Sequence, residues 1–118
     1  MEDSIKTQRT KIKEWSKTYL AGRSYLSPVG IVNITMSGIK EALNQPHKHQ
    51  SAKILAIRNI EMLLSTSEFI KTVADKRERP LMWHYLRVTI NSSDSYIVVR
   101  EDMLSGIKIL YSIVDSIK

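Results

Sequence analysis

The chain has 118 residues, of which 42% are hydrophobic and 25% charged, and it contains no cysteine. These values predict a single globular domain and exclude disulfides, thiolate metal sites and cysteine nucleophiles. The formal net charge of +6 favours a polyanionic partner such as nucleic acid, although simple solubility explains the same charge. No apolar run is long enough to span a membrane and the N-terminus lacks a signal-peptide block, so we expect a cytoplasmic protein that does not contact membranes.

The N-terminal part, residues 1–23, is expected to form a basic helix within this domain. Apolar residues between Asp3 and Tyr19 recur at helical spacing, and Gly22 is a suitable C-terminal cap. Residues 31–118 are expected to form an α+β core. The β-branched segment 31–35 predicts a short strand, after which Thr35 or Ser37 would cap a helix.

The clearest helical period in the chain begins at Ser51. Its apolar stripe consists of Ile54, Ile57, Ile60, Leu63 and Leu64. Ser65 and Glu68 have the spacing of a capping box, which predicts a further short helix through about Ala74. The charged segment 75–80 then predicts a loop that ends at Pro80.

After Pro80 the hydrophobic period changes to two, which predicts three strands in an antiparallel meander. Their cores are the segments 84–90, 96–101 and 107–114, and the segment 31–35 is a candidate fourth strand. The predicted fold class is therefore α+β, with N-terminal helices packed on a three- to four-stranded antiparallel sheet. An open polar sheet face on a small basic domain is a common platform for RNA.

The last predicted strand is apolar on both sides. Alternation places Ile107, Ile109, Tyr111 and Ile113 on one side, with Leu110 and Val114 on the other. A strand that is apolar on both faces is normally covered on both. Either the helices wrap around it, or a protein partner or a second copy of the chain packs against this C-terminal strand.

The three histidines are the first candidates for chemistry. His47 and His49 flank Lys48, and in an extended segment both rings point the same way. They lack a third nearby ligand, so we predict no metal site; a solvated loop and a general base near a phosphate remain the alternatives. His84 shares a strand face with Leu86. It is either a half-buried histidine at the edge of the sheet, satisfied by a backbone partner, or a catalytic one.

Cations supply the remaining candidates. Lys40 would contact a phosphate only if the N-terminus of its helix borders the site. Contacts to nucleic acid are expected from the two basic loops, through His47, Lys48, His49, Lys76, Arg77 and Arg79. No phosphate-loop or dinucleotide motif is present, and no cofactor is expected.

The order of these elements resembles a known family. The stretches 32–35, 38–40, 83–88, 96–100 and 106–111 are similar to the large polyvalent protein-associated domains of phages and conjugative elements. That family is grouped with the barnase–EndoU–colicin–RelE nuclease fold. The resemblance implies helices before a four-stranded antiparallel sheet and, in active members, metal-independent cleavage of RNA.

By position, the resemblance implies that His84, Arg87 and Lys40 are the catalytic candidates, with Tyr111 as a fourth. Two functions therefore remain open: a metal-independent ribonuclease-like domain of a mobile element, and a non-catalytic accessory domain that binds nucleic acid or protein. Catalysis requires Lys40, His84 and Arg87 to converge on one cleft that holds a phosphodiester.

Overall fold

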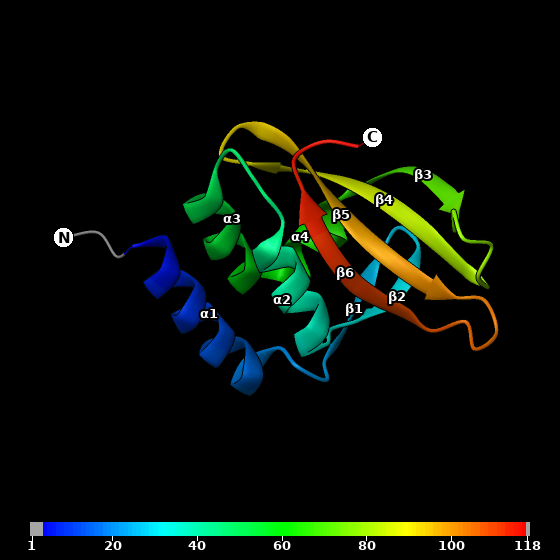
Figure 1. Cartoon of the computed structure of the whole chain (residues 1–118), viewed down its shortest axis with the longest axis horizontal. Coiled ribbons are helices and arrows are strands. Elements are labelled where there is room, and N and C mark those ends of the chain that lie inside the picture. Colours follow the sequence, from blue (N-terminus) through cyan, green and yellow to red (C-terminus); the bar gives the residue numbers. More distant parts are fainter. Residues whose placement is uncertain (1–3, 118) are drawn as a thin grey trace.

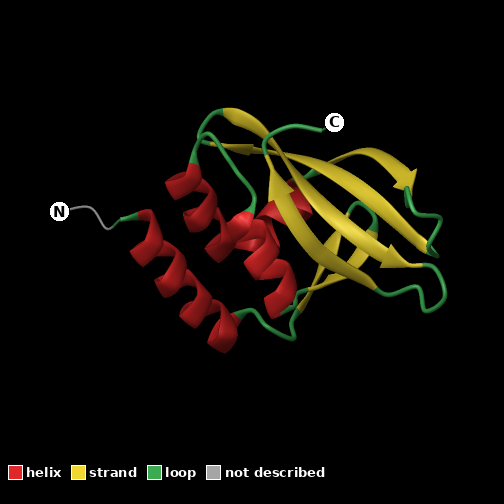
Figure 2. Cartoon of the chain, in the orientation of Figure 1, coloured by secondary structure: helices red, strands yellow, loops and turns green. Residues whose placement is uncertain are grey.

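The computed structural model describes residues 4–117 as a helical layer beside a curled sheet (Figure 1). The helices gather on one side of the molecule and the strands on the other, as the colouring of Figure 2 shows. The helical elements are α1 (Ile5–Tyr19), α2 (Met36–Asn44), α3 (Gln50–Ala56) and α4 (Ile60–Thr66), with a 3₁₀ turn at Ile57–Asn59 that joins α3 to α4. The strands are β1 (Ser24–Ser27), β2 (Gly30–Asn33), β3 (Glu68–Ala74), β4 (Leu81–Ile90), β5 (Ser93–Asp102) and β6 (Lys108–Val114).

Two of the described helices begin with a side-chain cap, of which only Thr35 was among the predicted caps. The C-terminal cap of α1 is Leu20, two residues before the predicted Gly22. The side chain of Ser4 accepts a hydrogen bond from the backbone of Thr7 at the start of α1. Thr35 caps α2, because its hydroxyl accepts from the Gly38 N–H at 3.1 Å. The predicted helical segment from residue 51 is confirmed, and Asp3, the predicted first residue of α1, lies outside the described residues.

The sheet is larger than predicted and is mixed. Its strand order is β1-β2-β6-β5-β4-β3, and it curls into a half-barrel. β2 runs parallel to β6, with Asn33 opposite Ile109, while the other neighbouring strands are antiparallel. The α+β class is confirmed, but the expectation of three to four antiparallel strands is wrong.

The predicted helix through Ala74 is also wrong, because α4 ends at Thr66 and β3 follows it. The hydroxyls of Ser65 and Thr66 donate back to the Met62 carbonyl of α4 and do not cap a new helix. Residues 69–73 are rich in aromatic and β-branched side chains, and they pair with β4 along its length. Tertiary pairing with a long neighbouring strand therefore overrides the local capping pattern.

One face of the sheet packs on the helices, and we call it the inner face. Leu86, Ile97, Val99 and Leu110 point into this core with no exposed surface. The opposite, outer face of β3 to β6 carries the alternate residues. No helix is packed along this outer face within the described part of the chain (Figure 1).

A β-bulge in β6 changes which residues reach each face. Val99 of β5 pairs with Leu110, but the next residue, Val98, pairs with Ser112, so Tyr111 is an extra residue. Tyr111 and Ser112 consequently both belong to the outer face, and Ile113 returns to the core with no exposed surface. The prediction that Ile113 shares a side with Tyr111 is wrong for this reason.

The position of β6 explains its apolar character on both sides. β6 lies between β2 and β5, with α2 packed on its inner face. Burial within one chain thus accounts for the pattern that suggested a homodimer through the C-terminal strand. A homodimer or a protein partner at this strand stays untested.

The close packing of α2 on β6 yields a first prediction. A Cβ atom on Gly38 would lie 1.9 Å from the Leu110 carbonyl oxygen, so Gly38→Ala must push the helix away from the strand. We expect it to lower the free energy of unfolding by about 1–3 kcal/mol or more, as measured by urea denaturation. Ser37→Ala, one residue earlier and exposed, should change stability by less than about 0.5 kcal/mol; equal stability of the two variants would contradict the close approach.

Candidate functional site

The residues expected to form a catalytic cluster do not converge. His84 lies on the inner face, whereas Arg87 lies three residues away on the opposite side of β4, where it pairs with Glu68 at 2.6 Å. Lys40 is exposed on α2, in the helical layer, and Tyr111 lies on the outer face. The structure therefore does not supply the single cleft that the predicted catalytic set requires.

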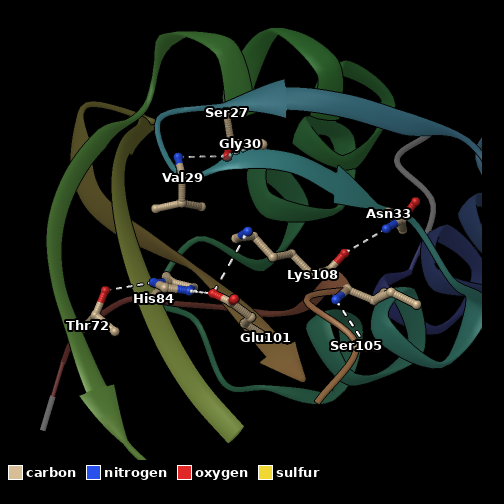
Figure 3. Close-up of polar contacts among 10 residues, drawn as sticks. Ser27, Val29, Gly30, Asn33, Thr72, His84, Glu101, Ser105 and Lys108 are labelled. Atoms are coloured by element: carbon tan, nitrogen blue, oxygen red, sulfur yellow. Dashed lines mark hydrogen bonds and ion pairs between the residues drawn. The ribbon is translucent and has the colours of Figure 1, made fainter. Parts of the chain in front are cut away.

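His84 is instead the centre of a polar network inside the curl of the sheet (Figure 3). Its Nδ1 lies 2.6 Å from the Thr72 hydroxyl, and its Nε2 lies 2.8 Å from a Glu101 carboxylate oxygen. That oxygen also lies 3.9 Å from the Lys108 ammonium group. Only 8% of His84 is exposed, and Val29 of the β1–β2 turn lies on the same side of the sheet (Figure 3). The network ties β3, β4, β5 and β6 together. The expectation of a half-buried histidine at the edge of the sheet with a backbone partner is wrong, because β4 is an internal strand and the partners of the ring are side chains.

His47 and His49 attach their loop to β5. His47 Nε2 lies 2.8 Å from the Ser95 hydroxyl, and His49 Nε2 lies 3.1 Å from the Ser93 hydroxyl. The expectation of a solvated loop is wrong for these two rings. Burial, followed by the nearby charge of Lys53, holds the pKa of His47 below its ordinary value. Within residues 4–117 no group of three or more histidine and carboxylate side chains is placed to hold a metal ion.

Lys53 is a buried cation that sequence reasoning missed. It has no exposed surface, and its ammonium group donates to the Gln45 carbonyl oxygen at 2.5 Å, just beyond the end of α2. Burial and, secondly, the charge of Arg9 lower the pKa of Lys53 to about 8. The spacing of the sequence does indicate this burial. Lys53 stands four residues before Ile57, so it lies on the same helix face as the apolar stripe.

The outer face carries a pocket of about 480 Å³, which we call the outer pocket. Its aromatic walls are Trp83, Tyr85 and Tyr111, and the Trp83 and Tyr111 rings meet edge to face with their centroids 4.8 Å apart. The Lys71 ammonium group lies 5.7 Å from the centre of the Tyr85 ring. The guanidinium carbon of Arg100 lies 5.8 Å from the centre of the Tyr111 ring. Aromatic rings and cations thus share one hollowed surface.

One residue that lines the outer pocket carries a hydroxyl group without a partner. Ser112 is 2% exposed and Val98, opposite it on β5, is 6% exposed, and both line the pocket. The Ser112 Oγ is buried and makes no hydrogen bond. Buried polar atoms nearly always have a hydrogen-bond partner, so an unpaired hydroxyl in a pocket requires an explanation.

A second hollow, of about 490 Å³, continues the outer pocket over the basic loop between β3 and β4. The two share the aromatic walls, and the second is also lined by Lys76, Arg77 and Arg79. Three of the six residues predicted to contact nucleic acid therefore adjoin the aromatic cluster. The other three, His47, Lys48 and His49, line neither hollow.

Asp75 fixes the geometry of this basic loop. Its carboxylate accepts hydrogen bonds from Nε and Nη2 of Arg79, at 3.0 and 2.9 Å, and from the Arg77 backbone N–H. It also accepts from the Trp83 indole N–H at 3.1 Å. The Arg79 guanidinium is the main reason that the pKa of Asp75 lies well below its usual range. One carboxylate therefore positions an aromatic wall and a cation of the rim together.

The burial of Lys53 makes a prediction about the pH dependence of stability. Between about pH 8 and pH 10.5 the folded chain has lost a proton from Lys53 that the unfolded chain still binds, so stability rises with pH relative to a Lys53→Met variant. The free energy of unfolding of the wild type, relative to that of Lys53→Met, should rise by about 3 kcal/mol across this pH range. Urea denaturation of both proteins at about pH 7 and about pH 10 measures it. Lys40→Met, at an exposed site, is the control, and parallel pH profiles for wild type and Lys53→Met would contradict the burial of a charged amine.

The role of Asp75 is tested by Asp75→Asn. Because the pKa of the carboxylate is lowered in the fold, its stabilising effect is present above the ordinary carboxyl range and is lost as the pH falls below about 4. We expect Asp75→Asn to lower the melting temperature at neutral pH and to weaken the near-ultraviolet circular dichroism of Trp83. Asp94→Asn, at an exposed position of β5, should change neither, and an unaltered tryptophan signal in Asp75→Asn would refute the positioning role.

No helix between residues 4 and 117 is long and apolar enough to cross a membrane.

Three comparisons relate the chain to known proteins. Searches of curated proteins and of solved structures found no match. A family model described as large polyvalent protein-associated domain 3 matches residues 3–110, which includes every strand up to the middle of β6.

Proposed function

The chain belongs to the large polyvalent protein-associated domain 3 family, and we propose that it acts as a nucleic-acid-binding domain through the outer face of its sheet. The observation that carries this proposal is the outer pocket, where three aromatic rings and a rim of cations share one surface. Proteins that bind single strands combine a positively charged groove with aromatic side chains on which bases stack.

The charges around the two hollows support an anionic ligand. Among the described residues, no carboxylate forms an ion pair with Lys71, Lys76 or Arg77. Arg79 pairs with Asp75, but its side chain remains 52% exposed. Cations gathered on one surface, three of them without a carboxylate partner, favour phosphates, because binding a polyanion there releases its condensed counterions.

The ribonuclease function receives less support from the geometry. Lys40 lies in the helical layer, His84 lies inside the curl of the sheet, and Arg87 lies on the outer face. They therefore do not act on one phosphodiester together. Binding requires only the cations and rings that are already gathered on the outer face. We therefore favour the accessory binding role over catalysis.

A salt-titrated binding measurement tests the proposed function. Fluorescence anisotropy with a labelled single-stranded RNA of about 12 nucleotides should show affinity that falls steeply between about 50 and 200 mM salt. The Lys71→Ala/Lys76→Ala double variant should bind more weakly, and the slope of log affinity against log salt should become shallower by about 1.4. This change removes two cations from the rim of the pockets.

The matched control is the Lys6→Ala/Arg23→Ala double variant, which removes the same charge from exposed positions outside both hollows. It should bind like the wild type. If the two double variants lose RNA affinity equally, the attraction comes from net charge alone. If the wild type does not bind the RNA, the proposal is refuted. Metal-free cleavage of the RNA that His84→Ala abolishes would favour the ribonuclease function instead.

A further inference from the structure

We propose that the outer pocket holds one unpaired nucleobase, stacked against its aromatic walls and hydrogen-bonded to the Ser112 hydroxyl. The ligand is then a single-stranded nucleic acid and not a duplex. This inference rests on the proposed function and deepens it, because it names the part of the nucleic acid that enters the site. Ser112 would be a residue that distinguishes bases.

The first argument is the shape and lining of the pocket. At about 480 Å³ it falls in the range of small-molecule sites, and its walls are the rings of Trp83, Tyr85 and Tyr111. Unpaired bases are commonly recognised by stacking on aromatic side chains. Side chains from β4 and β6 form these walls, so the rigid sheet holds the rings in place in the absence of a ligand.

The second argument is the unpaired hydroxyl of Ser112, a residue that lines the pocket. The Ser112 Oγ can donate one hydrogen bond and accept others, yet it is buried without a partner. The edge of a nucleobase presents both donors and acceptors, and it would satisfy this group. Ser16 Oγ is also buried without a partner, but it belongs to α1 in the helical layer and does not line the outer pocket.

The bulge in β6 connects these two arguments. In a regular strand, Tyr111 and Ser112 would point to opposite faces of the sheet. The extra residue in β6 places both on the outer face, where both line one pocket. Bulges commonly re-aim a side chain beside functional sites.

The third argument is the position of the cations. Lys71 and Lys76 line the outer pocket, and Arg77 lines the adjoining hollow. Phosphates bound at this rim leave a neighbouring base free to turn into the pocket. In a duplex the bases pair with each other inside the stack, so a base enters such a pocket only when it is unpaired.

The experiment compares four ligands by anisotropy: a single-stranded RNA, the same RNA as a duplex, a single-stranded oligonucleotide lacking bases, and heparin as a polyanion without bases. Wild type should prefer the single strand over the duplex and over the abasic strand by at least about 10-fold. Ser112→Ala should weaken binding of the single strand by about 3- to 10-fold, because it removes one hydrogen bond. The same substitution should leave binding of the abasic strand and of heparin unchanged.

A stability measurement separates a recognition role from a structural one. The hydroxyl makes no hydrogen bond in the protein, so Ser112→Ala should not lower the melting temperature of the unbound protein. Tyr85→Leu is the second variant, since it removes a wall of the pocket at a half-buried position. It should weaken binding of the single strand by at least about 5-fold. Ser37→Ala, at an exposed serine of α2, is the matched control and should bind like wild type.

Each outcome has a distinct meaning. Equal affinity for single strand, duplex and abasic strand would overturn the inference while the proposed function stands. A Ser112→Ala variant that melts at lower temperature, or that loses affinity for the abasic strand equally, would show that the hydroxyl is structural and would overturn the inference. If wild type binds none of the four ligands, both the inference and the proposed function fail.

Discussion

The bulge at Tyr111 in β6 decides which residues of this central strand enter the core and which reach the outer face. Helices cover only the inner face of the sheet, so β6 must supply core residues on that side and surface residues on the other. The bulge lets Leu110 and Ile113 both enter the core while Tyr111 and Ser112 both reach the outer face. Strict alternation would bury Ser112 in the core and send Ile113 to the surface.

This arrangement separates residues that hold the fold together from residues available to a ligand. Inside, His84, His47 and Lys53 are buried and hydrogen-bonded, and each links its own element to another part of the fold. Outside, the rings of the outer pocket and the cations of its rim are partly exposed. A titratable residue in this protein is therefore not a candidate for catalysis merely because its pKa is shifted, since structural networks shift pKa values as well.

The same contrast explains why binding is a better interpretation than catalysis. General acid–base chemistry requires its groups within hydrogen-bond reach of one substrate, and the two faces of β4 keep His84 and Arg87 apart. Binding tolerates looser geometry, because phosphates attract cations over several ångströms and every base offers a flat ring. Asp75 adds order to that surface by holding Arg79 and Trp83 with one carboxylate.

Features that depend on local pattern could be predicted from the amino-acid sequence. They are a helix capped at Thr35 or Ser37, the helical segment from residue 51, the three strands after Pro80, the inner-face position of His84 and the basic loop beside β4. Only the tertiary structure decided the features that depend on pairing between distant segments. β3 forms because β4 lies beside it, β2 runs parallel to β6 across the sheet, and the bulge depends on how β5 aligns with β6. Neither Ser112 nor Trp83 carries a local signal of function, because the pocket that joins them exists only once β4, β5 and β6 are paired.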